Sequence, residues 1–238
     1  RSCERGEPLY ESTSPGDCGR PSTVANLIER ARVEKFLTEN PRLALRPCAS
    51  GILIKGVYGF HVQVGSLQIE DEFDVSISIP ESFPKELPSV VETGRRIPRL
   101  PQFHVNADGT LCVGSPVRIL TLQSKSPTVQ GFVEHCLNPY LAAISHKLKH
   151  GGDLIFGELE HGAAGELADY AKLVGLKSTT QVRHFMWCLG KRRRVANKTP
   201  CPCNCGRRLG KCTFNKQVLN LRRMAPRSWF KARALQIA

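Results

Sequence analysis

The sequence predicts an α+β fold, in which one helix precedes an antiparallel sheet and further helices follow it. Apolar residues recur at helical spacing between residues 22 and 39. Residues 43–92 contain short runs of alternating apolar and polar residues, separated by turn formers. Helical spacing returns at residues 128–149. Because helices and strands are segregated along the chain, the pattern is typical of an α+β architecture.

The first helix is predicted to begin at Ser22 or Thr23, which suit an N-cap, and to end before Pro41. Residues 1–21 contain turn formers and little periodic apolar content, so they are expected to form a loose arm. The arm is polar and broken by Gly and Pro, and we expect no signal peptide in it.

Three strands are expected to form an antiparallel meander, and the last of them, EFDVSISI, alternates strictly. Pro80, Pro84 and Pro88 then exclude a central strand and predict an extended loop that leads into a short fourth strand. The four predicted strands are residues 43–47, 51–64, 72–79 and 89–92.

Beyond the sheet, residues 117–122 form only a brief apolar stretch. Residues 128–149 are predicted to be helical, with a kink or break at Pro139. Residues 151–161 form a Gly-rich loop, and a last helix is expected at residues 165–176.

Charge divides the chain near residue 176. From Lys177 onward there are 16 Lys or Arg and no acidic residue, whereas all 21 acidic residues precede that point. We therefore expect one domain at residues 22–176 and a basic module at residues 177–238 that faces an anionic partner, either nucleic acid or an acidic protein. A solvated basic surface is the alternative. The sequence contains no apolar run of about 18 residues, so we expect no membrane span.

The ten cysteines favour a reducing, cytoplasmic compartment over a secreted disulfide framework. Six are scattered singly, and four lie within twelve residues, at Cys201, Cys203, Cys205 and Cys212. Short-spaced thiolates of this kind are typical of a structural Zn²⁺ site, and a small module with little core needs such a metal for its fold.

One further cysteine, Cys112, lies in the stretch HVNADGTLCV. Asp108-Gly109 predicts a tight turn that presents Cys112 at an edge, where a nucleophile can be reached. The alternative is a small buried hydrophobe, as free cysteines usually are. His104 and Asn106 precede the cysteine in the same stretch.

The order of PESFPKELP, FHVNADGTLC and a two-part helix resembles the catalytic domain of ubiquitin-conjugating enzymes over residues 22–176. FGELEHGAAGELADY is similar to the next segment of the prokaryotic branch, which occurs beside activating-enzyme and antiviral nucleotidyltransferase genes. Three details depart from the eukaryotic pattern. Phe83 replaces the usual Tyr, Val105 replaces the Pro of His-Pro-Asn, and the gap from Asn106 to Cys112 is two residues shorter.

The resemblance implies a UBC-like fold whose cysteine, Cys112, receives an acyl group from an activating enzyme as a thioester and yields it to an amine. The donor would be a ubiquitin-like protein or a nucleotidyltransferase, in bacterial antiphage defence of the CBASS type. Asn106 is a candidate oxyanion donor or a turn residue that bonds backbone only. His104 is expected to hold the loop, and His161 is either a base or a solvated side chain.

The cysteine-rich string resembles the SEC-C zinc motif, in which Cys201, Cys203 and Cys212 match ligand positions. Thr213 stands where the fourth ligand belongs, so the fourth ligand is either Cys205 or a residue from elsewhere. Two other functions stay open. One is a UBC-fold protein that binds without catalysis, and the other is a nucleic-acid-binding protein that acts through basic runs interleaved with Trp187, Phe214, Trp229 and Phe230.

Overall fold

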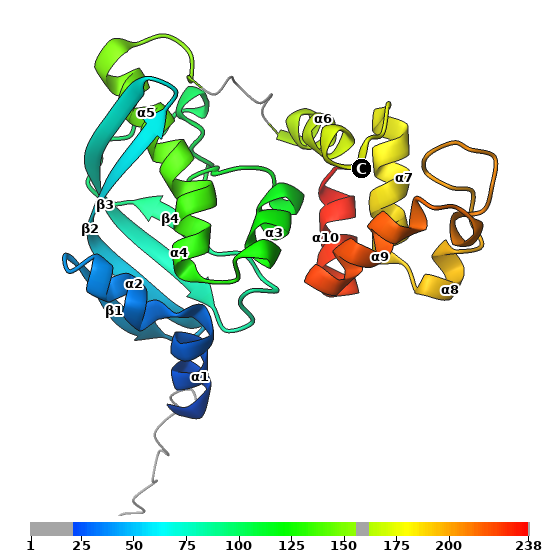
Figure 1. Cartoon of the computed structure of the whole chain (residues 1–238), viewed down its shortest axis with the longest axis horizontal. Helices are drawn as coiled ribbons and strands as arrows, with labels where there is room; N and C mark the ends of the chain where they lie inside the picture. The colour runs from blue at the N-terminus through cyan, green and yellow to red at the C-terminus, as the bar shows by residue number, and fades with distance from the viewer. Residues whose placement is uncertain (1–20, 156–161, 238) are drawn as a thin grey trace, which may run out of the picture.

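A computed structural model describes residues 21–155 and 162–237 (Figure 1). It confirms a mixed α and β chain with a four-stranded antiparallel sheet in the order β1-β2-β3-β4. The predicted arm at residues 1–21 lies outside the described residues up to residue 20, and Pro21 is the first residue of a helix. The strands are β1 Leu43–Cys48, β2 Gly51–Val64, β3 Leu67–Pro80 and β4 Ser89–Glu92.

The third strand begins five residues before its predicted start at residue 72. β2 and β3 form one long hairpin, whose register runs from Gly51 opposite Pro80 to Val64 opposite Leu67. Backbone pairing with β2 therefore extends β3 back to Leu67, and Leu67 and Ile69 continue the alternation of apolar residues that the predicted start at residue 72 left out. Gly51 is required beside the strand end, because a Cβ there would lie 2.1 Å from the Ile79 carbonyl oxygen.

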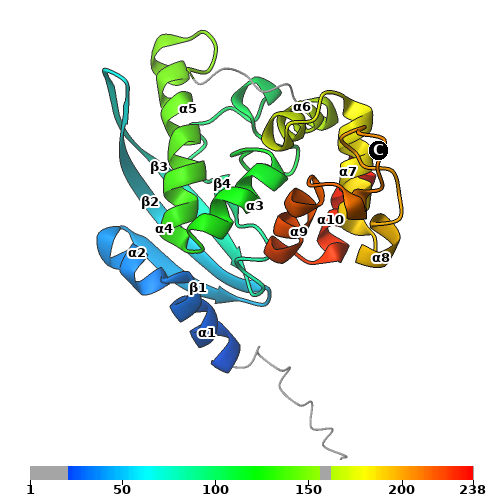
Figure 2. The same ribbon diagram turned by 45° about the vertical axis from the view of Figure 1, so that its right-hand side comes forward.

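One face of the sheet carries the first hydrophobic core. Ile52 and Ile54 of β2 face the same side as their partners Ile79 and Ile77 of β3, and all four are buried. Helices cover this face, as Figures 1 and 2 show. They are α1 Pro21–Ala31, α2 Val33–Glu39, α4 Val129–Phe132 and α5 Asn138–His150.

Two predicted helices differ in detail, and a third helix was not predicted. The single helix expected before the sheet is two helices, because Arg32 adopts a left-handed conformation between α1 and α2. The irregularity expected at Pro139 is a π-helical stretch, Val133–Leu137, which ends before Pro139 enters the first turn of α5. The brief apolar stretch after Cys112 is a full helix, α3 Pro116–Lys125.

A second core lies beside the first; most of it belongs to the part of the chain drawn from yellow to red (Figure 1), and Val117 and Leu120 of α3 join it. It includes Leu167 and Tyr170, so the helix before residue 176 packs with the basic module. The change in charge near residue 176 therefore does not coincide with the boundary between the two hydrophobic cores. No helix of the described residues is long and apolar enough to cross a membrane. The helices between residue 162 and the end of the described chain are α6 Gly162–Val174, α7 Thr179–Gly190, α8 Arg193–Ala196, α9 Asn215–Met224 and α10 Arg227–Gln236.

Candidate functional site

The segment that carries Cys112 extends the sheet beside β4. The backbone N–H of Leu111 donates to the Val90 carbonyl oxygen at 2.8 Å, and the N–H of Cys112 donates to the His104 carbonyl oxygen at 2.8 Å. The Cys112 side chain is half-buried, in contrast to the full burial of Leu111. The cysteine is therefore fixed by its backbone at the rim of the sheet, with part of its side chain accessible.

The predicted turn at Asp108-Gly109 is confirmed. The Gly109 N–H donates to the Asn106 carbonyl oxygen at 2.9 Å, and Gly109 has a φ of +84°. The Asp108 carboxylate accepts from both the N–H and the hydroxyl of Thr110, at 2.9 and 2.6 Å. The Thr110 hydroxyl is the largest influence that lowers the pKa of Asp108.

Asn106 and His104 both contribute to this turn. The Asn106 side-chain amide donates to the Thr110 hydroxyl at 2.9 Å, so in this conformation it closes the turn. The oxyanion role of Asn106 stays a prediction that needs the amide to leave Thr110. His104 is buried, and its backbone adopts the left-handed conformation. Its N–H donates to the Pro101 carbonyl oxygen, and its own carbonyl oxygen accepts from the Cys112 N–H. The predicted residue His161 lies outside the described residues.

Two residues that the sequence did not indicate, Glu166 and Tyr140, interact electrostatically with Cys112, and of the two only Glu166 shifts the pKa of its thiol. Burial is the main influence that raises its pKa; the Gly114 N–H opposes this, and the negative charge of Glu166, in α6, raises it further. Tyr140 of α5 donates its hydroxyl to the Phe103 carbonyl at 2.8 Å, and its own pKa is raised by burial and then by Cys112. Helical spacing places both residues on helices, but only the folded chain brings them near the sulfur.

A cavity of about 400 Å³ opens beside this segment. Gly109 and Leu111 line it, together with Arg95, Arg99 and the acidic residue Glu92. The cavity therefore reaches the neighbour of Cys112 in the chain, Leu111, whereas Cys112 is not among its lining residues.

The residues that follow Cys112 are tied to α6. The buried carboxylate of Asp169 accepts from the Ser115 hydroxyl and receives a two-pronged ion pair from the Arg118 guanidinium, whose Nε lies 2.9 and 3.0 Å from the two carboxylate oxygens. Although burial alone would raise the pKa of Asp169, the hydrogen bonds from Arg118 and Ser115 lower it. This ion pair joins the Cys112 segment to the second core.

The raised pKa of Cys112 leads to a pH prediction. We expect its alkylation by iodoacetamide to accelerate about tenfold per pH unit from neutral pH, without levelling off below the ordinary thiol pKa of 9.0. Removing the nearby negative charge in Glu166→Gln should speed the reaction about two- to threefold at fixed pH. Peptide mass spectrometry gives the rate at Cys112 alone. Glu134→Gln, at an exposed position, is the control, and equal acceleration in both variants would contradict the role of Glu166.

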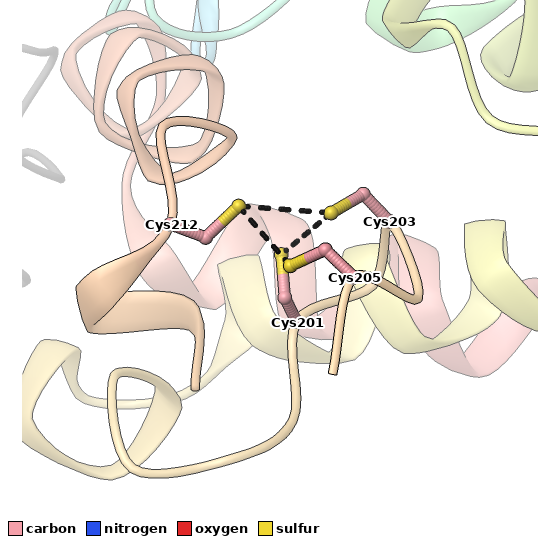
Figure 3. Close-up of side chains that lie close together, drawn as sticks. All are labelled: Cys201, Cys203, Cys205 and Cys212. Atoms are coloured by element: carbon pink, nitrogen blue, oxygen red, sulfur yellow. Dashed lines mark hydrogen bonds between the residues drawn. The ribbon is translucent and has the colours of Figure 1, made fainter. Parts of the chain in front are cut away.

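The second site is a cluster of four cysteine sulfurs in a loop of the basic module (Figure 3). The sulfurs of Cys201, Cys203, Cys205 and Cys212 all lie within 4.8 Å of one another, and none is in a disulfide. The separations are 3.2 Å from Cys201 to Cys203, 3.6 Å from Cys203 to Cys212 and 3.5 Å from Cys205 to Cys212. Four thiolates about 2.3 Å from one tetrahedral ion lie about 3.8 Å apart, so the cluster could bind a metal ion.

Cys205 completes the cluster, whereas Thr213 is exposed beside it and is not one of the four. The loop bends back through left-handed Asn204 and Gly206, which bring Cys205 to the others. The N–H of Arg207, and then its guanidinium, lower the pKa of the Cys205 thiol to about 6. A thiolate at this position is the protonation state that a metal requires.

Comparison with known proteins gives no relative: no family model, no curated protein and no solved structure matches the chain.

Proposed function

We propose that this chain is an acyltransferase of the ubiquitin-conjugating type, with Cys112 as the residue that carries the acyl group. The observation that carries the proposal is the half-buried thiol of Cys112, whose backbone is held at the edge of the sheet by the His104 carbonyl and, through Leu111, by β4. Cys136, by contrast, is buried.

The arrangement of the chain supports a UBC-like fold. A helical segment, an antiparallel meander, a proline-rich loop, the cysteine segment and a two-part helix succeed one another in the order that the resemblance implies. The proline-rich loop is docked on α1, because Arg30 donates to the carbonyl oxygens of Phe83 and Glu81 at 2.8 and 2.6 Å. Phe83 itself is buried in the first core. These hydrogen bonds would keep the loop beside the sheet while the cysteine reacts.

The proposed chemistry has two transfers. The Cys112 thiolate attacks the carbonyl carbon of a thioester on the activating enzyme, and that enzyme's thiolate leaves. An amine then attacks the new Cys112 thioester, an amide forms, and Cys112 leaves as a thiolate. Because burial disfavours this thiolate, it is a good nucleophile once formed but only a small fraction of the thiol. Glu166 is the candidate acceptor for the proton of the amine.

The partners follow from the resemblance. The acyl donor is a ubiquitin-like protein or a nucleotidyltransferase, delivered by an activating enzyme in the cytoplasm during bacterial antiviral defence. The four-cysteine cluster holds a structural Zn²⁺, since four thiolates at these separations suit that ion.

The test uses the full chain and a peptide that ends in a Gly-Gly thioester of mercaptoethanesulfonate. We expect intact-mass spectrometry to detect one acyl adduct, mapped to Cys112 and reversed by dithiothreitol. Cys112→Ala should lose it, Cys112→Ser should yield a slower adduct that resists dithiothreitol, and Cys48→Ala, at another half-buried cysteine, should keep it. An adduct that persists in Cys112→Ala, or that forms chiefly on Cys205, would refute the assignment.

A protein with this fold that binds a ubiquitin-like partner without catalysis gives a different result. Cys112→Ala would then capture the partner as tightly as the original chain does, and neither would form an adduct.

A further inference from the structure

Residues 177–237 carry positive charge that no acidic residue within this range balances. No Lys or Arg from residue 177 to residue 237, all of which the structure describes, forms a salt bridge with a described carboxylate. Some of these side chains have internal roles. Arg183, for example, donates to the Ile237 carbonyl oxygen at 2.8 Å. Most of the others are exposed. Such a surface repels itself unless an anion binds it.

Several of these cations gather where α7, α8, α9 and α10 meet. Arg222 donates to the carbonyl oxygens of Cys188 and Lys191 at 2.6 and 2.7 Å, which draws α9 against the end of α7. Burial lowers the pKa of Arg222, Cys188 opposes this, and the positive charges of Arg193 and Arg227 lower it further. The guanidinium groups at the starts of α8 and α10 therefore act on Arg222 electrostatically, and α7 packs against α8, α9 and α10 alike.

An exposed indole lies beside this cluster. Trp187 is 37% exposed, and every other Phe, Tyr or Trp among the described residues is buried or half-buried. The Lys191 ammonium lies 5.0 Å from the Trp187 ring centroid, and the His184 ring lies 5.9 Å away. A large aromatic ring that is partly exposed beside an ammonium group offers a flat apolar surface and charge together.

We propose that the surface formed by Trp187, Lys191, Arg192, Arg193, Arg194 and Arg227, which we call the Trp187 surface, binds single-stranded nucleic acid. The cations bind phosphates, and an unpaired base stacks on the indole. An acidic protein would use the charges but would leave the indole without a matching partner. A duplex would reach the charges but would keep its bases stacked inside.

The Trp187 surface is independent of the proposed acyl transfer. The neighbours of Cys112 in the chain, Leu111 and Val113, pack in or against the first core. No hydrogen bond among the described residues joins the Cys112 backbone to α7. Nucleic-acid binding and acyl transfer can therefore fail or succeed separately, and Cys112→Ala should bind nucleic acid as the original chain does.

The test is fluorescence anisotropy with the zinc-loaded full chain and labelled 20-nucleotide oligothymidylate or oligouridylate. We expect binding that weakens steeply with salt, and Trp187→Ala should weaken it about tenfold while Trp187→Phe keeps most of it. Arg193→Gln with Arg194→Gln should reduce the slope of log K against log salt by about 0.7 for each phosphate that is no longer neutralised.

The control is Lys35→Gln with Lys55→Gln, which removes the same charge from exposed positions on the elements around the first core. This pair should leave the affinity and its salt dependence unchanged. Three outcomes would overturn the proposal: equal weakening by this control pair, unchanged affinity in Trp187→Ala, or equal affinity for a blunt duplex. Displacement of the oligonucleotide by equimolar polyglutamate would point instead to an acidic protein partner.

Discussion

Removing the Zn²⁺ that we propose for the four-cysteine cluster is expected to release the loop at residues 199–214 from its folded state. This loop contains one 3₁₀ turn, Leu209–Lys211, and one isolated bridge, between Pro200 and Arg208, so it has little regular structure of its own. Without the proposed ion, the buried sulfurs of Cys201 and Cys212 no longer share a metal that holds the two ends of the loop together. We expect about one equivalent of zinc in the purified chain, and amide exchange in the loop about a hundredfold faster after chelation.

The amides of β2 and β3 provide the internal control, because the first core contains none of the four cysteines. Cys201→Ser should reproduce the effect of chelation without a chelator, and Cys48→Ser, outside the cluster, should not. Less than half an equivalent of zinc, or loop protection that survives chelation, would contradict the metal site.

The second large effect is expected at Asp169. Its buried carboxylate is 1% exposed and holds both Ser115 and Arg118, so Asp169→Ala leaves a cation and a hydroxyl without their partner. The free energy of unfolding should fall by about 3 kcal/mol, measured by urea titration. Asp169→Asn, which keeps an acceptor for Ser115, should lose less.

The contribution of Asp169 should also depend on pH. Its folded pKa is lowered, so the stabilisation is complete above the ordinary aspartate pKa of 3.8 and is lost as the pH falls through the folded pKa. The difference between the original chain and Asp169→Asn should therefore shrink in acid. Asp153→Asn, at an exposed position, should stay within about 0.5 kcal/mol at every pH. A loss in Asp169→Ala no larger than in Asp153→Asn would refute the role of the buried pair.

Strands were easier to predict than the helices around them. β4 has the predicted bounds, and the predicted bounds of β2 are also those of the structure, because alternation and flanking turn formers are local signals. α3 was missed since its apolar residues divide between two cores: Val117 and Leu120 face the second, and Ile119 faces the first. A helix buried on both sides shows no single apolar stripe, so its period is hidden.

The candidate sites show the same division. The spacing of the four cysteines and the turn before Cys112 are local, and both could be recognised from the sequence. Glu166, Tyr140 and Asp169 could not, because each reaches the Cys112 segment from a helix far along the chain. Their roles depend on which helix faces pack together.

The sequence by itself determined the antiparallel sheet, the turn that presents Cys112 and the cluster of four cysteines, because each depends on neighbours a few residues apart. The tertiary structure alone decided three other features. It packed α6 with the basic module, gave Cys112 a buried environment that raises its pKa, and brought Arg222 of α9 against the end of α7. Each of these depends on contacts between distant segments, whose partners are set by the packing of two cores and not by any local pattern.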